Sequence, residues 1–501
     1  MSQQRATAEP PYIGTVNVRQ GTTRRSLCVA GVLASLAIPL AGAQAAQSPD
    51  AIALPSNRVI RKLVAERVNS LAGQEDGIGI IIGVVGPQGR RVISYGHLGR
   101  EDSRPLDGNT GFEIGSVTKV FTALLLADMV RKGEVALADP VAKYLPAPVR
   151  IPKREGRSIT LLDLATHTSG LPFMPDELPE MDDLAAAKYS AAQLYEFLAR
   201  YELPRDIGAE WDYSNVGYWL LGQALAARAG MNYESLLQMR VIAPLNLRST
   251  AFTVSPKLKA KLAVGHNAVL QPAPTFSAVP GYALMPAAGG LVSTVSDLLS
   301  LLSVAMGYQC SPLAPSMAMM LSTRRPTGTS EQALGWVVIG KGDDQLIIHD
   351  GGTFGYASSV AWDPTRRIGI VVLSNQMTGV SDIARHLLRP NVPLERPTAT
   401  KRIEIALDSA VADTYVGRYE ARGEGNFIIA RKRGFLTIQP PVEWGLPKLR
   451  LRAESLRDFF VAEIPLRVTF QTDSAGHVNG VLVYPPRGQQ AIPASRLSAD
   501  R

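Results

Sequence analysis

Segments typical of β-strands stand at both ends of the first 390 residues. Residues 77–96 read as two strands around a Gly86–Gly89 turn, and "QLIIHDGG", "ASSVAWDP" and "IGIVVLSNQ" are short β-branched runs between turns. The segments between them have helical patterns. We expect helices near 56–71, 116–132, 158–166, 190–200, 214–229, 233–241 and 294–305. This order predicts a mixed fold, α/β in the broad sense and α+β in the strict one. One antiparallel sheet would be built from both ends of the domain, with an all-helical lobe packed on it.

The last hundred residues have a different texture. At 501 residues the chain is too long for one ordinary core. Residues 389–402 contain three prolines and few large apolar residues, which predicts a linker at 391–402. From residue 403 to 501, strand-like runs alternate with turn signals about every ten residues, which predicts a separate small all-β barrel or sandwich.

The first 45 residues have the features of an export signal. An arginine pair, Arg24-Arg25, precedes an apolar run from Leu27 to Leu40, and Ala43-Gln44-Ala45 fits a cleavage site. We therefore expect residues 1–45 to be removed, so that the mature chain begins with a folded domain at 46–390. Export would follow the Sec or the twin-arginine route to the periplasm or the medium. An uncleaved membrane anchor is the alternative; no other stretch is long and apolar enough to span a bilayer.

Charge and rare residue types narrow the function classes. The net charge is +8, but the lysines and arginines are scattered, so we expect a solvated surface and no nucleic-acid partner. Of the two cysteines, Cys28 lies in the signal, which leaves Cys310 and no internal disulfide. The six histidines are dispersed and match no zinc pattern, so we expect no metal and no cofactor. The sequence leaves the oligomeric state open.

A serine stands where the predicted helix 116–132 begins. In "FEIGSVTKVF", Ser116 could be an N-cap that accepts bonds from free backbone N–H groups, with Lys119 pointing into water. Alternatively, Ser116 is a nucleophile. Residues i and i+3 share a helix face, so Lys119 would lie beside it and, if buried, could take its proton.

Two further features favour the nucleophile. "EWDYSNVGYW" contains Tyr213 and Asn215 just before a helix, where the plain alternatives are a half-buried aromatic and a helix cap. "IIHDGGTFGY" contains His349-Asp350-Gly351-Gly352 after an apolar strand, where a plain alternative is a hairpin turn.

Together these residues carry the chemistry of a lysine-assisted serine hydrolase. Tyr213 would relay a proton between Ser116 and the leaving group, and Asn215 would hold Lys119 and a substrate carbonyl. The backbone N–H groups of Ser116 and Gly352 would form the oxyanion hole. Gly351 would leave room for the acyl group.

The order S-x-x-K, Y-x-N and a strand-borne x-x-G resembles the penicillin-recognising serine enzymes. More narrowly, residues 50–390 resemble class C β-lactamases and their low-molecular-weight D,D-peptidase and esterase relatives. "THTSGLP", "YSNVGYWLLG" and "AAGGLVSTVSDLL" extend the likeness. The tail resembles the lipocalin-like barrel that some of these relatives carry. The resemblance implies a serine hydrolase whose catalytic residues are Ser116, Lys119 and Tyr213, with Asn215, His349, Gly351 and Gly352 orienting the substrate.

Two positions depart from the family pattern. The third motif of classical β-lactamases begins with lysine and threonine, which bind the antibiotic's carboxylate, whereas this chain has His349 and Asp350. The chain has Phe173-Met174 after "THTSGLP", where class C enzymes use a nearby glutamine to grip the substrate's amide side chain. We therefore expect weaker turnover of β-lactams, with Asp350 repelling an anion unless its side chain faces away from the cleft.

The sequence thus favours a β-lactam or D-amino-acid peptide amide as the bond cleaved, in a small molecule or a peptidoglycan peptide. The first alternative is a carboxylesterase that uses the same site on small neutral esters. The second is a catalytically inert penicillin- or peptidoglycan-binding protein.

Overall fold

The computed structural model describes residues 54–69, 77–175, 190–273, 275, 286–395, 402–432, 434–441, 444, 446, 448–462, 464–485 and 490–497. The predicted signal peptide and residues 396–401 of the predicted linker lie outside them. Within the described residues, no helix combines the length and the apolarity that a membrane crossing requires.

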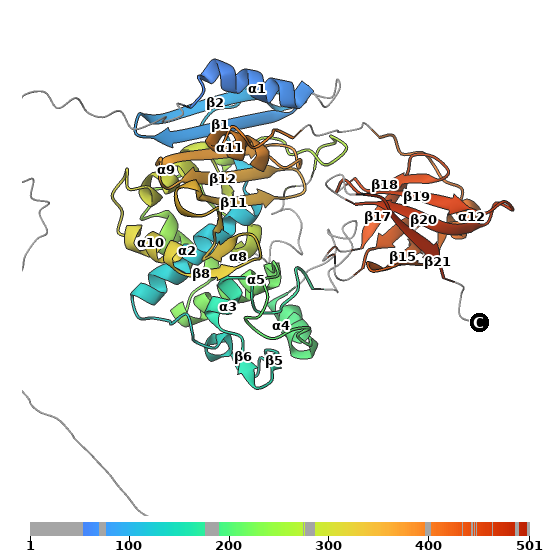
Figure 1. The fold of residues 1–501 in the computed structure, drawn as a ribbon, viewed down its shortest axis with the longest axis horizontal. Helices are drawn as coiled ribbons and strands as arrows, with labels where there is room; N and C mark the ends of the chain where they lie inside the picture. The colour runs from blue at the N-terminus through green and yellow to red at the C-terminus, as the bar shows by residue number, and fades with distance from the viewer. Residues whose placement is uncertain are drawn as a thin grey trace, which may run out of the picture. The chain divides into compact units, whose positions relative to one another are not determined.

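A nine-stranded antiparallel sheet joins the two ends of the first domain. Its order is β3-β2-β1-β13-β12-β11-β10-β9-β8. The early strands are β1 (Gly79–Gly86), β2 (Gly89–Gly99) and β3 (Asp102–Pro105), and the late ones are β8 (Arg324–Pro326), β9 (Glu331–Ala333), β10 (Val337–Ile339), β11 (Leu346–Gly352), β12 (Ala357–Asp363) and β13 (Ile368–Ser374). β1 pairs with β13, so blue and orange strands lie side by side in Figure 1. The predicted sheet built from both ends is confirmed.

The sheet separates two hydrophobic cores, because successive side chains of a strand point to opposite faces. On β1, Ile81 and Val85 pack into the core of the helical lobe. Ile80, Ile82 and Val84 pack into a second core with α1 (Asn57–Asn69) and α11 (Ser381–Leu388). β1 therefore reads as a continuous apolar run.

The helical lobe is built around α2 (Thr118–Arg131), which is buried from Thr118 to Met129. A helix that is apolar on all sides must be surrounded by protein. The helices that pack on it are α5 (Asn215–Ala229), α6 (Tyr233–Leu237), α8 (Pro286–Gly289) and α10 (Ala314–Ser322). The lobe also contains α3 (Leu161–Ala165), α4 (Ala191–Arg200) and α9 (Val295–Ala305).

Three local expectations were incomplete. The predicted helix 233–241 is α6 followed by a π-helical turn, Gln238–Ile242. The predicted helix 158–166 shortens to α3, because Thr160 and Asp163 form a capping box that starts it later. The sequence interpretation assigned neither α10 nor α11, which are both short.

The tail forms a closed eight-stranded barrel. Of the two predicted all-β forms, a barrel or a sandwich, the structure has the barrel. Its core contains the aromatic side chains of Tyr415, Tyr419, Phe427, Phe459 and Phe470. The Tyr415 ring, from α12 (Ser409–Tyr415), stacks on that of Phe470 at 4.2 Å. The strands are β14 (Gly417–Ala421), β15 (Gly425–Lys432), β16 (Phe435–Gln439), β17 (Leu449–Ala453), β18 (Asp458–Phe460), β19 (Arg467–Thr472), β20 (Val478–Tyr484) and β21 (Ile492–Arg496). The domain boundaries themselves stay a prediction.

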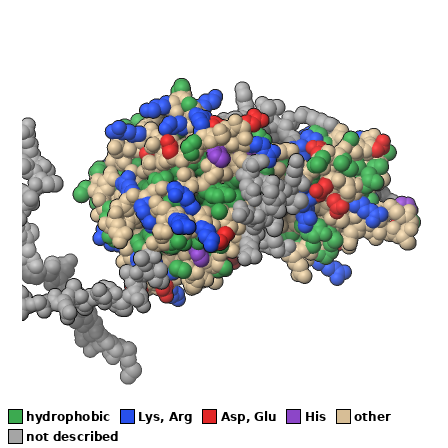
Figure 2. All heavy atoms as spheres, turned by 90° about the horizontal axis from the view of Figure 1, so that it is seen from above, with side chains coloured by type: hydrophobic (Ala, Val, Ile, Leu, Met, Phe, Trp, Pro, Cys, Tyr) green, Lys and Arg blue, Asp and Glu red, His purple; other side chains and the backbone are tan. Residues whose placement is uncertain are grey.

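Surface charge is dispersed on the face that Figure 2 draws, where Lys and Arg side chains stand among hydrophobic and acidic ones. That no nucleic acid binds here stays a prediction.

A buried ion pair connects the first helix of the domain to the last. Arg67 of α1 and Asp382 of α11 are 2% and 5% exposed, and Arg67 Nε lies 2.7 Å from Asp382 Oδ2. A second bond joins Arg67 Nη2 to Asp382 Oδ1 at 3.0 Å. The backbone N–H of Glu395 also donates to Asp382.

Replacing Arg67 with methionine is expected to lower the free energy of unfolding by about 3–5 kcal/mol, because the Asp382 carboxylate stays buried without its counter-ion. Urea unfolding of the two proteins measures the difference. The matched control is Lys62→Ala on the same helix, since the Lys62–Glu66 pair is exposed and worth less than about 1 kcal/mol. Equal effects of the two changes would contradict the prediction.

Candidate active site

Ser116 lies in a single 3-10 turn, Gly115–Val117, that leads into α2. Val117 occupies the N-cap position of α2, and no side chain makes a capping bond there. The N-cap alternative for Ser116 therefore does not describe this structure. Instead, Ser116 Oγ lies 2.9 Å from Lys119 Nζ, one helical turn along.

Lys119 is fully buried and has three oxygen neighbours. Besides Ser116 Oγ, its Nζ lies 2.7 Å from Asn215 Oδ1 and 2.7 Å from the carbonyl oxygen of Ala288. Burial lowers the pKa of Lys119 well below its ordinary value, because the charged form is the one that loses hydration. A neutral amine has two N–H donors, which suit the two carbonyl oxygens, and one lone pair, which suits the Ser116 hydroxyl. The geometry thus fits a base.

Asn215 reaches Lys119 from the first turn of α5. Ser214, not Asn215, is the cap of this helix, since its Oγ accepts from the N–H of Gly217. The Asn215 backbone N–H donates to the carbonyl of Phe173, and its Nδ2 lies 3.6 Å from the sulfur of Met174. The second departure from the family pattern, Met174, therefore contacts a residue of the site.

The Ala288 carbonyl is held in place from α2 itself. Thr122, one turn after Lys119, donates from Oγ1 to the Ala287 carbonyl at 2.6 Å. The Thr118 hydroxyl accepts from the N–H of Leu291 at 3.2 Å. Successive turns of α2 therefore fix the segment that gives Lys119 its third oxygen.

Tyr213 also reaches Ser116. The Ser116 side chain lies near enough to the phenol to oppose part of the rise in its pKa, and the Tyr213 ring centroid lies 4.8 Å from Lys119 Nζ. Burial raises the pKa of Tyr213 above its ordinary value, and the negative charge of Asp350 adds to the rise. Tyr213 is therefore a neutral phenol, which can donate its proton and then be reprotonated.

Strand β11 runs against the turn that carries Ser116. A Cβ atom at Gly351 would lie 2.1 Å from the carbonyl oxygen of Ile114 and 3.0 Å from the amide nitrogen of Ser116. A Cβ atom at Gly115, whose φ is +48°, would lie 2.6 Å from the amide nitrogen of Gly352. The amides of Ser116 and Gly352 thus belong to one backbone contact. Gly351 is confined by this contact with the Ser116 turn, which is a different reason from the expected passage of an acyl group.

His349 and Asp350 lie on opposite faces of β11, because side chains alternate along a strand. His349 is buried, and its Nδ1 lies 2.7 Å from the Asp350 carbonyl oxygen. Burial, reinforced by the positive charge of Lys119, lowers the pKa of His349 to about 3. His349 is therefore neutral at neutral pH. The Asp350 carboxylate accepts from the Ser359 hydroxyl at 2.7 Å, and Asp350 itself is exposed.

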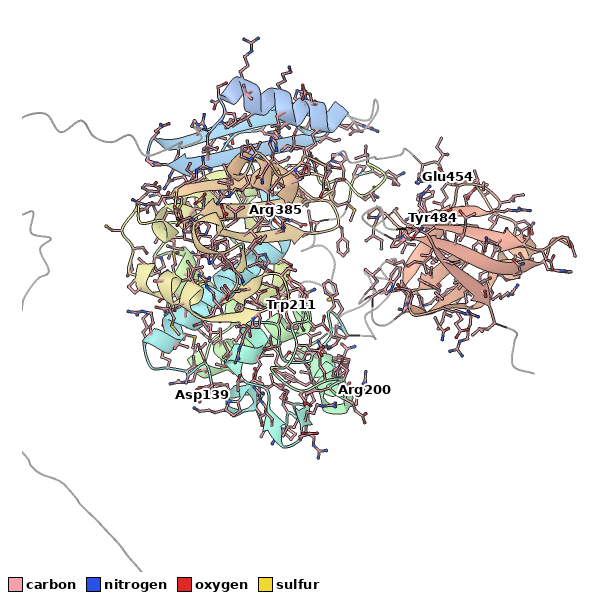
Figure 3. All side chains as sticks on the ribbon, viewed as in Figure 1. Asp139, Arg200, Trp211, Arg385, Glu454 and Tyr484 are labelled. Carbon is pink, nitrogen blue, oxygen red and sulfur yellow. The ribbon has the colours of Figure 1, made fainter. Side chains whose placement is uncertain are left out.

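The structure also brings in residues that the sequence interpretation did not assign to the site. The His167 ring stacks on Tyr213 at 4.3 Å. Trp211, labelled in Figure 3, has its ring 6.4 Å from that of Tyr213 and donates from Nε1 to Gln332. The "THTSGLP" stretch contains His167, but no spacing rule connects that histidine with Tyr213.

Comparison with known proteins agrees with this geometry. Residues 57–390 match the family model "Beta-lactamase". A beta-lactamase of Pseudomonas fluorescens is 27% identical over 350 residues, which cover 63% of this chain and 94% of that protein. The D-alanyl-D-alanine-carboxypeptidase/endopeptidase AmpH of Escherichia coli K12 is 29% identical over 315 residues, which cover 57% of this chain and 78% of AmpH.

A solved structure, a class C beta-lactamase, matches with a TM-score of 0.56 and 22% identity, over 66% of this chain and 96% of that one. This likeness bears on the fold alone. The family match over 57–390 bears on the chain itself, which is a serine hydrolase of the beta-lactamase family.

Proposed function

We propose that this enzyme is exported and cleaves a β-lactam or D-amino-acid peptide amide through an acyl-enzyme on Ser116. The observation that carries the proposal is the buried Lys119 amine, 2.9 Å from Ser116 Oγ, with two carbonyl oxygens accepting its N–H groups. The names of the relatives support the substrate class, since they include beta-lactamases and a D-alanyl-D-alanine carboxypeptidase.

In the first step, neutral Lys119 takes the hydroxyl proton as Ser116 Oγ bonds to the substrate carbonyl carbon. The N–H groups of Ser116 and Gly352 stabilise the negative oxygen that develops. As the C–N bond breaks, Tyr213 gives its proton to the leaving nitrogen and is reprotonated by the Lys119 ammonium. Water then releases the acyl group by the same steps in reverse, with Asn215 and His349 orienting the groups around it.

A carboxylesterase is the second candidate, because the third motif offers no fixed positive charge. A lysine there would bind a substrate carboxylate, whereas His349 is neutral and buried. A small neutral ester does not need that charge. The inert binding protein is the third reading, and labelling of Ser116 separates it from both hydrolases.

The acylation site can be tested with a penicillin and a short p-nitrophenyl ester. The intact protein should gain the mass of the acyl group, and peptide mapping should place it on Ser116. Ser116→Ala should fold and form no adduct. An adduct on another serine, or hydrolysis by Ser116→Ala, would contradict the proposal, and no adduct from any acylating probe would favour the inert reading.

A second variant, Lys119→Arg, tests the base. Arginine keeps its positive charge at every working pH and cannot take the Ser116 proton, so this variant should not be acylated. In the wild type, the neutral Lys119 amine exists above its lowered pKa, so activity should persist at neutral pH and fall as the pH drops through that pKa. A rate that rises only near the ordinary lysine pKa would exclude Lys119 as the base.

The third motif should set the preference between esters and carboxylate-bearing substrates. His349→Lys with Asp350→Thr is expected to raise kcat/KM for penicillin, relative to the ester, by roughly one to two orders of magnitude, since a charge-assisted hydrogen bond contributes about 1.5–3 kcal/mol. The control pair, His349→Met with Asp350→Thr, has a similar side-chain length without the charge and should leave the ratio low. A wild type that already prefers penicillin by far would contradict this prediction.

Export can be tested independently of catalysis. Protein recovered from the periplasm or the medium should begin near Ala46 on N-terminal sequencing, because Ala43-Gln44-Ala45 fits the cleavage rule. An intact Met1 in a cytosolic fraction would overturn this part of the proposal.

A further inference from the structure

Residues 212–214 contact His167 through two backbone hydrogen bonds and one ring stack, and these three contacts fix the position of Tyr213. The backbone N–H of Asp212 donates to the His167 carbonyl at 2.8 Å. The backbone N–H of Ser214 donates to His167 Nδ1 at 3.0 Å. Between them, the Tyr213 ring stacks on the His167 ring with centroids 4.3 Å apart and planes 28° apart. Both chain neighbours of Tyr213 and its ring therefore bind one histidine.

His167 is itself firmly placed. It is 1% exposed and packs against Tyr218 at 5.1 Å on α5. The next residue, Thr168, is tied on both sides, because its N–H donates to the Asp163 carbonyl and its carbonyl accepts from Gly208. His167 has a φ of +57°, a conformation that is uncommon outside glycine and persists where the surroundings impose it. The backbone around His167 is thus held rigidly.

The chemical state of the ring follows from its partner. A backbone N–H can only donate, so Nδ1 must present its lone pair to Ser214, and the single ring proton stays on Nε2. Burial lowers the pKa of His167 well below its ordinary value, and a proton on Lys119 or on His349 lowers it further. The ring therefore supports Tyr213 as a neutral platform and adds no second cation beside Lys119.

We propose that His167 is a positioning residue that keeps the Tyr213 hydroxyl at Ser116, where it can protonate the leaving group. His167 hydrogen-bonds no reacting atom in this arrangement and acts through Tyr213. The inference rests on the proposed role of Tyr213, so its test must measure that role separately.

Two esters with the same acyl group separate positioning from general stability. An ethyl ester needs a proton on its departing oxygen, whereas p-nitrophenolate leaves readily as an anion. Loss of a general acid should lower kcat/KM, which reports acylation, by about 10²–10⁴-fold for the ethyl ester and by little for the p-nitrophenyl ester. A change that merely reduces the folded fraction lowers both rates equally, and active-site titration by the p-nitrophenol burst corrects for it.

The variants are Tyr213→Phe, His167→Asn and the double change. Asparagine tolerates a positive φ and can still accept a hydrogen bond, but it cannot stack. The matched control is His386→Asn, which removes a histidine of α11 whose Nδ1 is hydrogen-bonded to the Val392 carbonyl beyond the helix. We expect His167→Asn to lower the ethyl-to-nitrophenyl rate ratio in the direction of Tyr213→Phe, and the double change to be no worse than Tyr213→Phe alone.

The outcomes are distinguishable. If Tyr213→Phe lowers both ester rates equally, the proposed role of Tyr213 fails, and this inference fails with it. If Tyr213→Phe is selective but His167→Asn leaves the ratio at the His386→Asn value, only the inference about His167 is overturned. Where His167→Asn does not fold, His167→Phe makes the same comparison, because it keeps a ring against Tyr213 and removes the Nδ1 acceptor together with the Nε2–H group. The same drop in the ratio, smaller in size, is then expected.

Discussion

The burial of Lys119 is the constraint on which the site depends. An amine inside an apolar helix bundle is tolerable only if its hydrogen-bonding groups are satisfied. The three oxygens that satisfy it come from three elements: Ser116 before α2, Asn215 at the start of α5 and Ala288 in α8. Displacing any one element leaves a buried polar group unpaired, at a cost of about 1–3 kcal/mol. The same burial that lowers the pKa of Lys119 therefore also fixes the arrangement around it.

The sheet supplies the other half of the site. Because β1 pairs with β13, the late strands lie beside the early ones, and β11 passes the turn that carries Ser116. Glycines at 115 and 351 let the two backbones meet, since a Cβ at either position would overlap the other segment. The Ser358 hydroxyl on β12 donates to the Ile114 carbonyl and adds a further tie. The position of the Ser116 amide relative to Gly352 is thus a property of the whole sheet.

Charge distinguishes this site from one with a lysine in the third motif. Lys119, His167 and His349 are all buried, and the pKa of each is lowered, mainly by burial. The positive charge of Lys119 also lowers the pKa of both histidines, so a proton on Lys119 discourages a second one nearby. A catalytic centre of this kind can hold the proton taken from Ser116 without presenting a permanent cation to the substrate. This is the physical basis for expecting neutral substrates to be handled well.

The sequence by itself determined the helix that begins just after Ser116 and carries Lys119, since a spacing of three residues places two side chains on one face of a helical turn. It also determined the sheet from both ends and the all-β tail, because β-branched runs between turns specify strands locally. Only the tertiary structure decided what surrounds those residues. Lys119 and Ala288 are 169 positions apart, and His167 and Ser214 are 47 apart. Both contacts use a backbone group, which every residue possesses, so no side-chain pattern marks them. They exist because packing brings the segments together.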